Sequence, residues 1–201
     1  MGAGREHTTR APGPTPRRVL LVGPRVAFFA RLAATLRAGG TGADVTRDAA
    51  LADADEIRGY GAVVFARTTG ADERAAVRAA FAAAGSRAVF LESPAPLVAV
   101  LAAQLEQALL EQARQERAGT RRLAGLSAEP GRALVEVAVA CRVRVTGHGT
   151  SRLRRPRARD LFDERLPPGT HPVPLGARTT HVVARTYGEV LVTAVPAGPG
   201  R

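Results

Sequence analysis

Two different periodicities divide the chain into two parts. Up to about residue 117, short continuous apolar runs alternate with stretches in which apolar side chains recur every three or four residues. Such runs are typical of buried parallel strands, and the longer period is typical of the helices that cover them. From Arg132 onward the period falls to two, which indicates strands with one buried face. The pattern predicts an α/β domain followed by an all-β domain.

The first part of the chain predicts four strands with a helix after each. The predicted strands are residues 19–22, 43–46, 62–66 and 88–91. The predicted helices are residues 26–38, 49–58, 70–84 and 94–117. Because strands that alternate with helices favour a parallel sheet, we expect a small Rossmann-like or flavodoxin-like sheet in the order 2-1-3-4, with helices on both faces.

Two helix ends allow more specific predictions. Thr69 and Asp72 have the spacing of a capping box, which predicts that both side chains satisfy free amides at the start of the third helix. The second half of the last helix is polar all round, and a helix end of this kind usually projects from its domain as a connector. We therefore expect an unknown protein partner, or self-association, through the 94–117 helix or through the all-β domain.

The second part of the chain predicts a small antiparallel β-sandwich. Its strand candidates are residues 133–140, 141–145, 161–166, 171–175, 179–186 and 189–195, separated by glycine and proline. We therefore expect a disordered tail over residues 1–17, the α/β domain over 18–117, a linker over 118–131, the β-sandwich over 132–196 and a second disordered tail over 197–201.

The composition of the chain indicates the cellular compartment in which we expect the protein. The 201 residues are 45% hydrophobic, which suffices for a packed core, and no apolar run is long enough to span a membrane. The first 17 residues have no apolar signal-peptide core. The one cysteine, Cys141, cannot form an internal disulfide, and we expect the protein to be cytoplasmic and without a membrane partner.

The net charge of +11 comes from arginine alone, because the chain contains no lysine. Residues 19–113 are nearly balanced, with nine arginines and ten acids, whereas residues 114–201 carry sixteen arginines and seven acids. Such a change in charge usually marks a change of domain. The positive charge therefore belongs mainly to the predicted β domain.

Residues 18–113 resemble the N-terminal half of the short-chain dehydrogenase/reductase family. The resemblance lies in the strand and turn at 19–23, the helix after them, the 43–45 strand and the 60–66 strand. It implies a Rossmann-like fold and, in that family, an NAD(P) cofactor held at the first turn. Gly23, Arg25 and Arg67 would then lie nearest to a bound phosphate. Receiver domains of response regulators are similar to this stretch at the same level.

The chain lacks residues that both families need. A dinucleotide turn uses glycines to let the backbone approach the pyrophosphate, but the later glycine positions hold Arg25 and Phe28, or Ala27 and Phe29 in the longer spacing. We expect these phenylalanine rings to fill the phosphate space. The catalytic Tyr-x-x-x-Lys of the dehydrogenases cannot exist without lysine, and Gly23-Pro24 and Arg67 replace the receiver acids.

The second domain resembles fibronectin type III-like and FlgD-like sandwiches of bacterial proteins. The similar stretches are residues 166–175, of the type L-x-x-G-x-H, and residues 188–192. Domains that carry these patterns are mostly interaction or spacer modules. The resemblance therefore implies a binding or spacing role for the β domain.

The sharpest local feature is a run of five arginines within eight residues: Arg152, Arg154, Arg155, Arg157 and Arg159. In a loop, such a run would bind nucleic-acid phosphates or an acidic partner. No aromatic residue is interleaved to stack on bases, and the following Asp160, Asp163 and Glu164 would neutralise part of the charge.

Other reactive residue types do not form a recognisable site. His148, His171 and His181 have spacings that match no zinc pattern, and Cys141 lies where a strand would bury it. We therefore expect no metal, no cofactor and no catalysis. The expected function is that of a non-catalytic interaction or scaffold protein. An NAD(P)-linked oxidoreductase relative and an arginine-mediated binder of nucleic acid or acidic partners remain alternatives.

Overall fold

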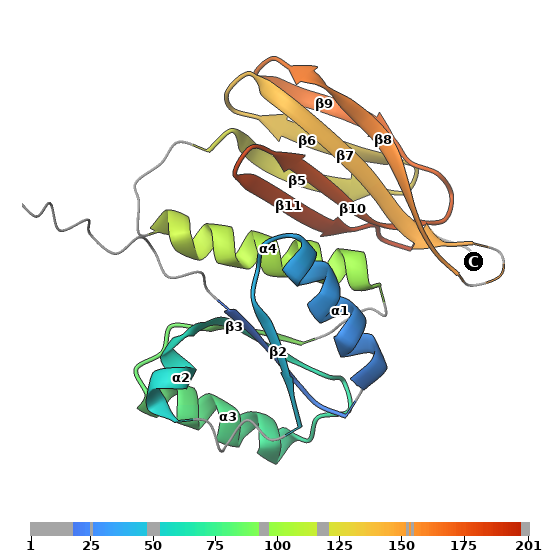
Figure 1. Ribbon diagram of the computed structural model, residues 1–201. Coiled ribbons are helices and arrows are strands. Elements are labelled where there is room, and N and C mark those ends of the chain that lie inside the picture. Colours follow the sequence, from blue (N-terminus) through green and yellow to red (C-terminus); the bar gives the residue numbers. More distant parts are fainter. Residues whose placement is uncertain are drawn as a thin grey trace, which may run out of the picture.

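A computed structural model of the protein describes residues 18–24, 26–47, 53–92, 97–115, 121–151, 153 and 155–197 (Figure 1). The predicted tail at 1–17, residues 198–201 of the predicted tail at 197–201, and Arg25, Arg152 and Arg154 lie outside these residues.

The apolar runs of the first part form a parallel sheet. Its strands are β1 (Arg18–Val22), β2 (Ala43–Thr46), β3 (Tyr60–Phe65) and β4 (Val89–Glu92), in the order β2-β1-β3-β4. All pairings are parallel, which confirms the predicted fold class and strand order. Residues 19–22 and 60–65 are buried throughout because both faces of the two central strands are covered.

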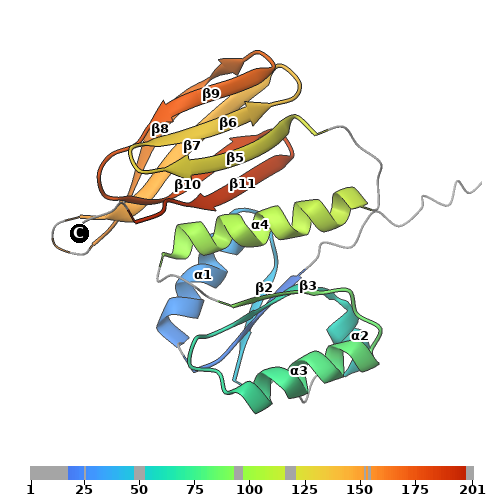
Figure 2. The same cartoon turned by 180° about the vertical axis from the view of Figure 1, so that it is seen from behind.

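Helices cover both faces of this sheet (Figures 1 and 2). On one face α1 (Val26–Ala38) and α4 (Val98–Gln115) share a core with β1 and β3. On the other face α2 (Ala54–Arg58) and α3 (Ala71–Ala83) bury Ile57, Val77 and Phe81. None of the helices described has the length and apolar composition that crossing a bilayer requires.

The predicted capping box is wrong. Gly70 is the N-cap of α3 and provides no side-chain hydrogen bond. The Thr69 hydroxyl is buried, with 2% of the residue exposed, and donates to the Val22 carbonyl oxygen at 3.3 Å. It is thus committed to β1 and does not cap the helix. A side-chain cap occurs instead at α2, where Asp53 accepts from the Glu56 amide at 2.8 Å.

The second part forms two antiparallel sheets that pack as a sandwich around a shared apolar core. One sheet contains β5 (Leu123–Glu129), β6 (Arg132–Val137) and β9 (Gly169–Pro174). The other has the order β11-β10-β7-β8 and contains β7 (Cys141–Thr150), β8 (Pro156–Leu166), β10 (Thr179–Thr186) and β11 (Glu189–Ala194).

Two stretches differ from the sequence prediction. Strand β5 lies within residues 118–131, which were predicted to be a linker. Its sequence alternates weakly, but pairing with β6 supplies backbone hydrogen bonds and buries Leu123. The arginine run was predicted to be a loop, whereas Arg157 and Arg159 lie on β8.

The polar second half of α4 predicted a helix end that projects from its domain, but α4 does not project. It lies between the parallel sheet and the sandwich (Figures 1 and 2). Leu101 and Leu105 face the parallel sheet, while Ala103 packs on the opposite side against Val183 and Val190. Polar groups of the same helix contact the sandwich, because Glu106 pairs with Arg185 and the Gln107 Oε1 atom accepts from the Val192 amide at 2.9 Å. The two domains are therefore joined along α4.

Candidate functional site

The turn after β1 is closely packed. Gly23 is buried and has a φ of 137°, a conformation that favours glycine. A Cβ atom added there would lie 2.6 Å from Ala66 Cβ and 2.9 Å from Thr69 Oγ1. The glycine therefore allows a close approach to the segment that follows β3, and side chains of that segment fill the space beside it. Arg67, at the same edge of the sheet, is exposed.

The two phenylalanines belong to the hydrophobic core. Phe29 is 1% exposed and packs among the residues that α1, α4 and the sheet bury together. Phe28 is half-buried against the same cluster. The atoms nearest to Gly23 come from Ala66 and Thr69. The side chains that pack against this turn thus come from the segment after β3, and the predicted role of the phenylalanine rings is corrected. The sequence did not indicate this contact, because the two segments lie far apart along the chain.

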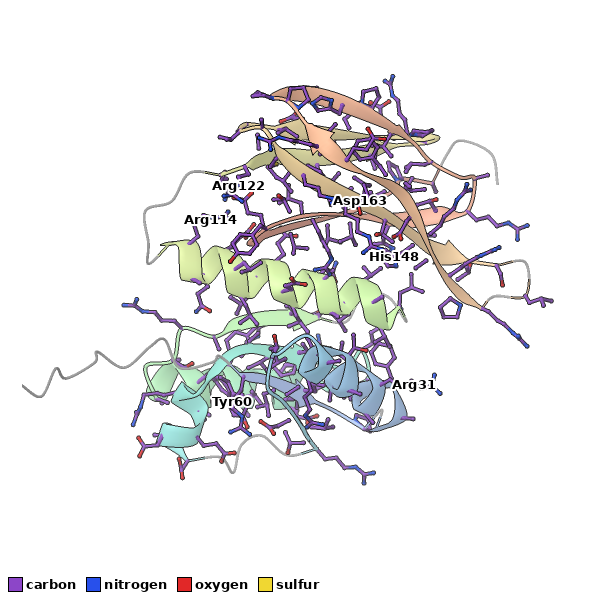
Figure 3. All side chains as sticks on the ribbon, turned by 45° about the horizontal axis from the view of Figure 1, so that its top comes forward. Arg31, Tyr60, Arg114, Arg122, His148 and Asp163 are labelled. Atoms are coloured by element: carbon purple, nitrogen blue, oxygen red, sulfur yellow. The ribbon has the colours of Figure 1, made fainter. Side chains whose placement is uncertain are left out.

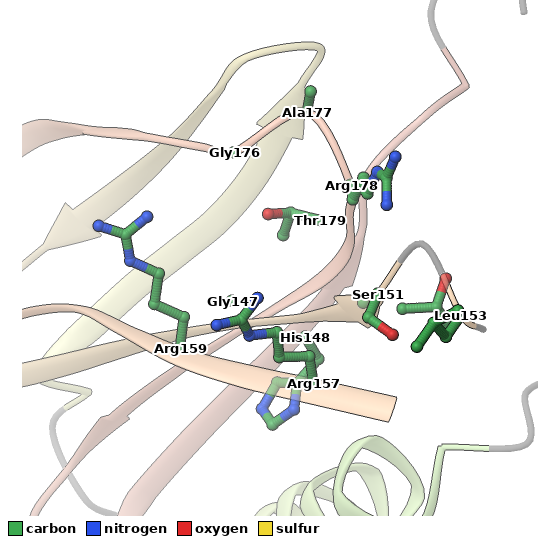
Figure 4. Close-up of a pocket in the computed structure, with 12 residues that line it drawn as sticks. Gly147, His148, Ser151, Leu153, Arg157, Arg159, Gly176, Ala177, Arg178 and Thr179 are labelled. Atoms are coloured by element: carbon green, nitrogen blue, oxygen red, sulfur yellow. The ribbon is translucent and has the colours of Figure 1, made fainter. Parts of the chain in front are cut away.

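A pocket of about 720 Å³ opens at one end of the β-sandwich (Figure 4). Its lining comes from the β7–β8 hairpin and from the turn before β10. Three arginines line it: Arg157, Arg159 and Arg178. In Figures 1 and 2 this end of the hairpin extends past the first turn of α4.

Glycines make room for this pocket. On β7, Gly147 pairs with Arg159 and Gly149 pairs with Arg157. Opposite residues in a pair of strands share a face, so both arginine side chains lie over glycines. A Cβ atom at Gly149 would lie 2.0 Å from the Arg178 carbonyl oxygen. The apolar core of the sandwich therefore ends here in a hollow whose lining includes Arg157, Arg159 and Arg178.

A register shift decides which face the β8 arginines take. Val145 pairs with Phe162, but the next residue, Thr146, pairs with Asp160. Leu161 is therefore an extra residue in β8, and residues 156–160 point to the faces opposite to those that an uninterrupted register would give them. Asp160 is thereby placed on the outer face with Thr146, and Arg159 on the pocket side.

The acids that follow the arginine run neutralise other arginines. Asp160 accepts from Arg144 at 2.6 Å and from Thr146 at 3.2 Å, and Asp163 accepts from Arg142 at 2.8 Å. The hydrogen bond from Arg144 lowers the pKa of Asp160, and that from Arg142 lowers the pKa of Asp163. Both acids are thus engaged by β7.

The three pocket arginines have no such partner. Within the described part of the chain, Arg157, Arg159 and Arg178 make no side-chain hydrogen bond or ion pair with another residue. Three unneutralised guanidinium groups around one concavity produce a local positive potential. Guanidinium groups in turn favour carboxylate or phosphate ligands, to which they donate paired hydrogen bonds.

The structure brings together part of the predicted arginine patch. Arg157 and Arg159 line the pocket, and Arg155 closes the hairpin through its backbone, because its amide donates to Ser151 Oγ at 3.2 Å and its carbonyl accepts from the Ser151 amide at 2.8 Å. The predicted Arg152 and Arg154 lie outside the described residues. Arg178 was missed, since a single arginine in a glycine-containing turn carries no local signal.

His148 and His181 lie on the face of their sheet opposite to the one that carries Arg157 and Arg159. His148 and His181 are cross-strand neighbours on β7 and β10, and the His148 ring points away from Arg157 and Arg159 (Figure 4). Burial lowers the pKa of both imidazoles, and His181 and Arg185 lower that of His148 further. His171 lies on β9, with its Nε2 atom 2.9 Å from the Pro167 carbonyl oxygen. No group of three metal-binding side chains occurs among the described residues.

The pocket lining is rich in hydrogen-bond donors. Its described residues comprise glycines, arginines, hydroxyl side chains, an alanine, a leucine and His148, with no carboxylate among them. Cys141 is buried in the sandwich core, as predicted, and is not part of the pocket. The arrangement provides hydrogen-bond donors for an anion.

Comparisons of the chain with protein-family models, with curated proteins and with solved structures found no match. The resemblances to dehydrogenases and to fibronectin-like sandwiches therefore remain hypotheses about the family. Inference about function rests on the geometry of the two domains.

Proposed function

We propose that this protein is a non-catalytic interaction protein whose β domain binds an anionic partner in the arginine-lined pocket. The observation that carries the proposal is that Arg157, Arg159 and Arg178 line one hollow and that no acidic side chain among the described residues pairs with them.

In this proposal the α/β domain has a structural role and holds the β domain through helix α4. A Cβ atom at Gly23 would meet Ala66 and Thr69, so the first turn of the α/β domain is closely packed on that side, and this turn lacks the later glycines of a dinucleotide turn. Helix α4 contacts the sheet with one side and the sandwich with the other. Because both sides of the helix are occupied, the proposal places the partner on the β domain and not on residues 94–117.

The test is anion binding by a matched pair of double variants. A labelled polyglutamate peptide is titrated with the protein, and fluorescence anisotropy is measured at low and moderate salt. R157Q/R159Q removes two pocket charges, and R165Q/R87Q removes two exposed charges outside the pocket lining. Each lost charge-assisted hydrogen bond is worth roughly 1.5–3 kcal/mol, so we expect the pocket variant to bind at least about tenfold more weakly. Equal weakening in both variants would reject the pocket as the site.

A further inference from the structure

The pocket lies beside an open sheet edge. Strand β8 is the last strand of its sheet and, among the strands described, pairs only with β7. Residues 156–160 of this strand are all exposed. In the described part of the chain, no backbone hydrogen bond covers their outer side. An edge of this kind presents a row of free N–H and C=O groups to another extended chain.

The charges on this edge have the spacing of a strand. Arg157 and Arg159 are separated by one residue, Ala158, so they lie on the same face of β8. An extended chain that paired with β8 would place its side chains opposite them on that face, two residues apart. Arg178 lines the same pocket from the turn before β10. Two acidic side chains of such a chain would therefore face the guanidinium groups of Arg157 and Arg159.

A peptide suits this surface better than a nucleic acid or a free phosphate does. No phenylalanine, tyrosine or tryptophan occurs in the described lining to form a stacking platform for successive bases. A free phosphate would leave the strand edge unused. Leu153, at the rim of the pocket, is 77% exposed and offers an apolar contact to a neighbouring side chain of the partner.

We infer that the partner is an extended acidic segment of a protein, which adds as a strand to the free edge of β8 and places two acidic side chains, separated by one residue, against Arg157 and Arg159. This inference rests on the proposed function and specifies the partner class. Main-chain hydrogen bonds would supply affinity, and the arginines would select acidic or phosphorylated side chains.

The experiment separates strand addition from simple charge attraction. The probe is a short labelled peptide in which two glutamates flank one valine. Alternate amides of a strand point to opposite edges, so the peptide has two sets of amides. In each of two further versions, one of these sets carries N-methyl groups. All three peptides have the same charge, but an added strand uses only one set of amides for pairing. Anisotropy titrations compare the peptides on the unmodified protein, so the result does not depend on a variant that folds.

We expect one N-methylated peptide to bind at least about tenfold more weakly than the parent and the other to bind like the parent. Only the amides that face β8 donate hydrogen bonds to it, so methylation weakens binding only when it blocks that set. R157Q/R159Q should weaken the parent peptide, whereas R165Q/R87Q should not. If both N-methylated peptides bind like the parent, strand addition is overturned while the anion pocket stands.

A nucleic acid or a small anion would also overturn the inference. Duplex DNA and inorganic tripolyphosphate are titrated under the same conditions. If either of them binds in a manner that R157Q/R159Q abolishes while the acidic peptide does not bind, the proposed function holds with a different partner. If no probe binds, the proposed function and the inference both fail.

Discussion

The Glu189 carboxylate lies 3.3 Å from the guanidinium group of Arg114, a contact that joins the first strand residue of β11 to the end of α4. Glu189 also accepts the backbone amides of Arg122, at 2.9 Å, and Leu123, at 2.8 Å. Figure 3 shows Arg114 and Arg122 close together at this end of the helix. Glu189 is 7% exposed, and a buried carboxylate is tolerated only when its hydrogen bonds are satisfied. One side chain therefore holds α4, β5 and β11 together.

Replacing Glu189 with alanine should destabilise the whole chain. The change leaves two backbone amides without their acceptor and Arg114 without its ion pair. We expect a loss of about 2–4 kcal/mol in the free energy of unfolding, measured by urea denaturation. The control is Glu164→Ala, because Glu164 is an exposed residue of β8. Equal loss in the two variants would show that Glu189 does not anchor the joint.

Tyr60 should ionise at unusually high pH. Its hydroxyl lies 3.2 Å from an Asp44 carboxylate oxygen, and burial together with that carboxylate raises its pKa to about 12. Tyr187→Phe leaves Tyr60 as the sole tyrosine, because the chain has two. We expect the tyrosinate absorbance of this variant to rise with a midpoint at about 12, and Asp44→Asn to lower that midpoint. A midpoint near the ordinary value of about 10 would contradict the buried contact.

The same shift predicts a loss of stability in alkali. The folded state holds Tyr60 in its neutral form, so the unfolded chain releases the proton first. The contribution is fully present below about pH 10 and is lost as the pH rises toward 12. Urea denaturation of the Tyr60→Phe variant should show a smaller decline over this range than the unmodified chain does.

Mild acid should destabilise the β domain through His148 and His181. Burial, first of all, lowers the pKa of both imidazoles, and the unfolded chain therefore binds protons before the folded chain does. Stability is retained above the unfolded value of about 6.5 and falls as the pH decreases through and below it. We expect thermal melting at about pH 5.5 to occur at lower temperature than at about pH 7.5.

A double variant, H148Q/H181Q, should reduce that difference between the two pH values. His171→Gln is the matched control, because His171 lies on β9 and its ring contacts the Pro167 carbonyl oxygen. If the double variant and the control show the same pH dependence as the unmodified chain, the two half-buried imidazoles do not cause it.

NADPH should leave the melting temperature unchanged. A ligand that binds the native state must raise the melting temperature, and the space beside Gly23 holds Ala66 and Thr69. Differential scanning fluorimetry with a dinucleotide-binding protein as a positive control provides the measurement. A rise that depends on NADPH concentration would reject the filled turn and favour a cofactor-binding protein.

The order of apolar and polar residues was enough to predict the fold class and the strand order of the parallel sheet. Residues 19–22 and 62–66 are apolar without interruption, and this pattern permits only strands that are covered on both faces. The short period beyond Arg132 likewise predicted antiparallel sheets. The apolar runs and the short period depend on neighbouring residues along the chain and are therefore visible in the sequence, whereas the strand order was predicted from the usual way in which alternating strands and helices connect.

The candidate site depends on contacts between distant residues. The sequence indicated an arginine run, but it could not show that the shift at Val145–Thr146 turns Arg157 and Arg159 toward the pocket. It also could not show that Asp160 and Asp163 form ion pairs with Arg144 and Arg142. Nor could it show that Arg178, from the turn before β10, lines the same pocket. Periodicity determined which residues are buried, whereas strand register and the packing of α4 were decided by tertiary structure, because both arise from pairing between segments that the order of residues leaves open.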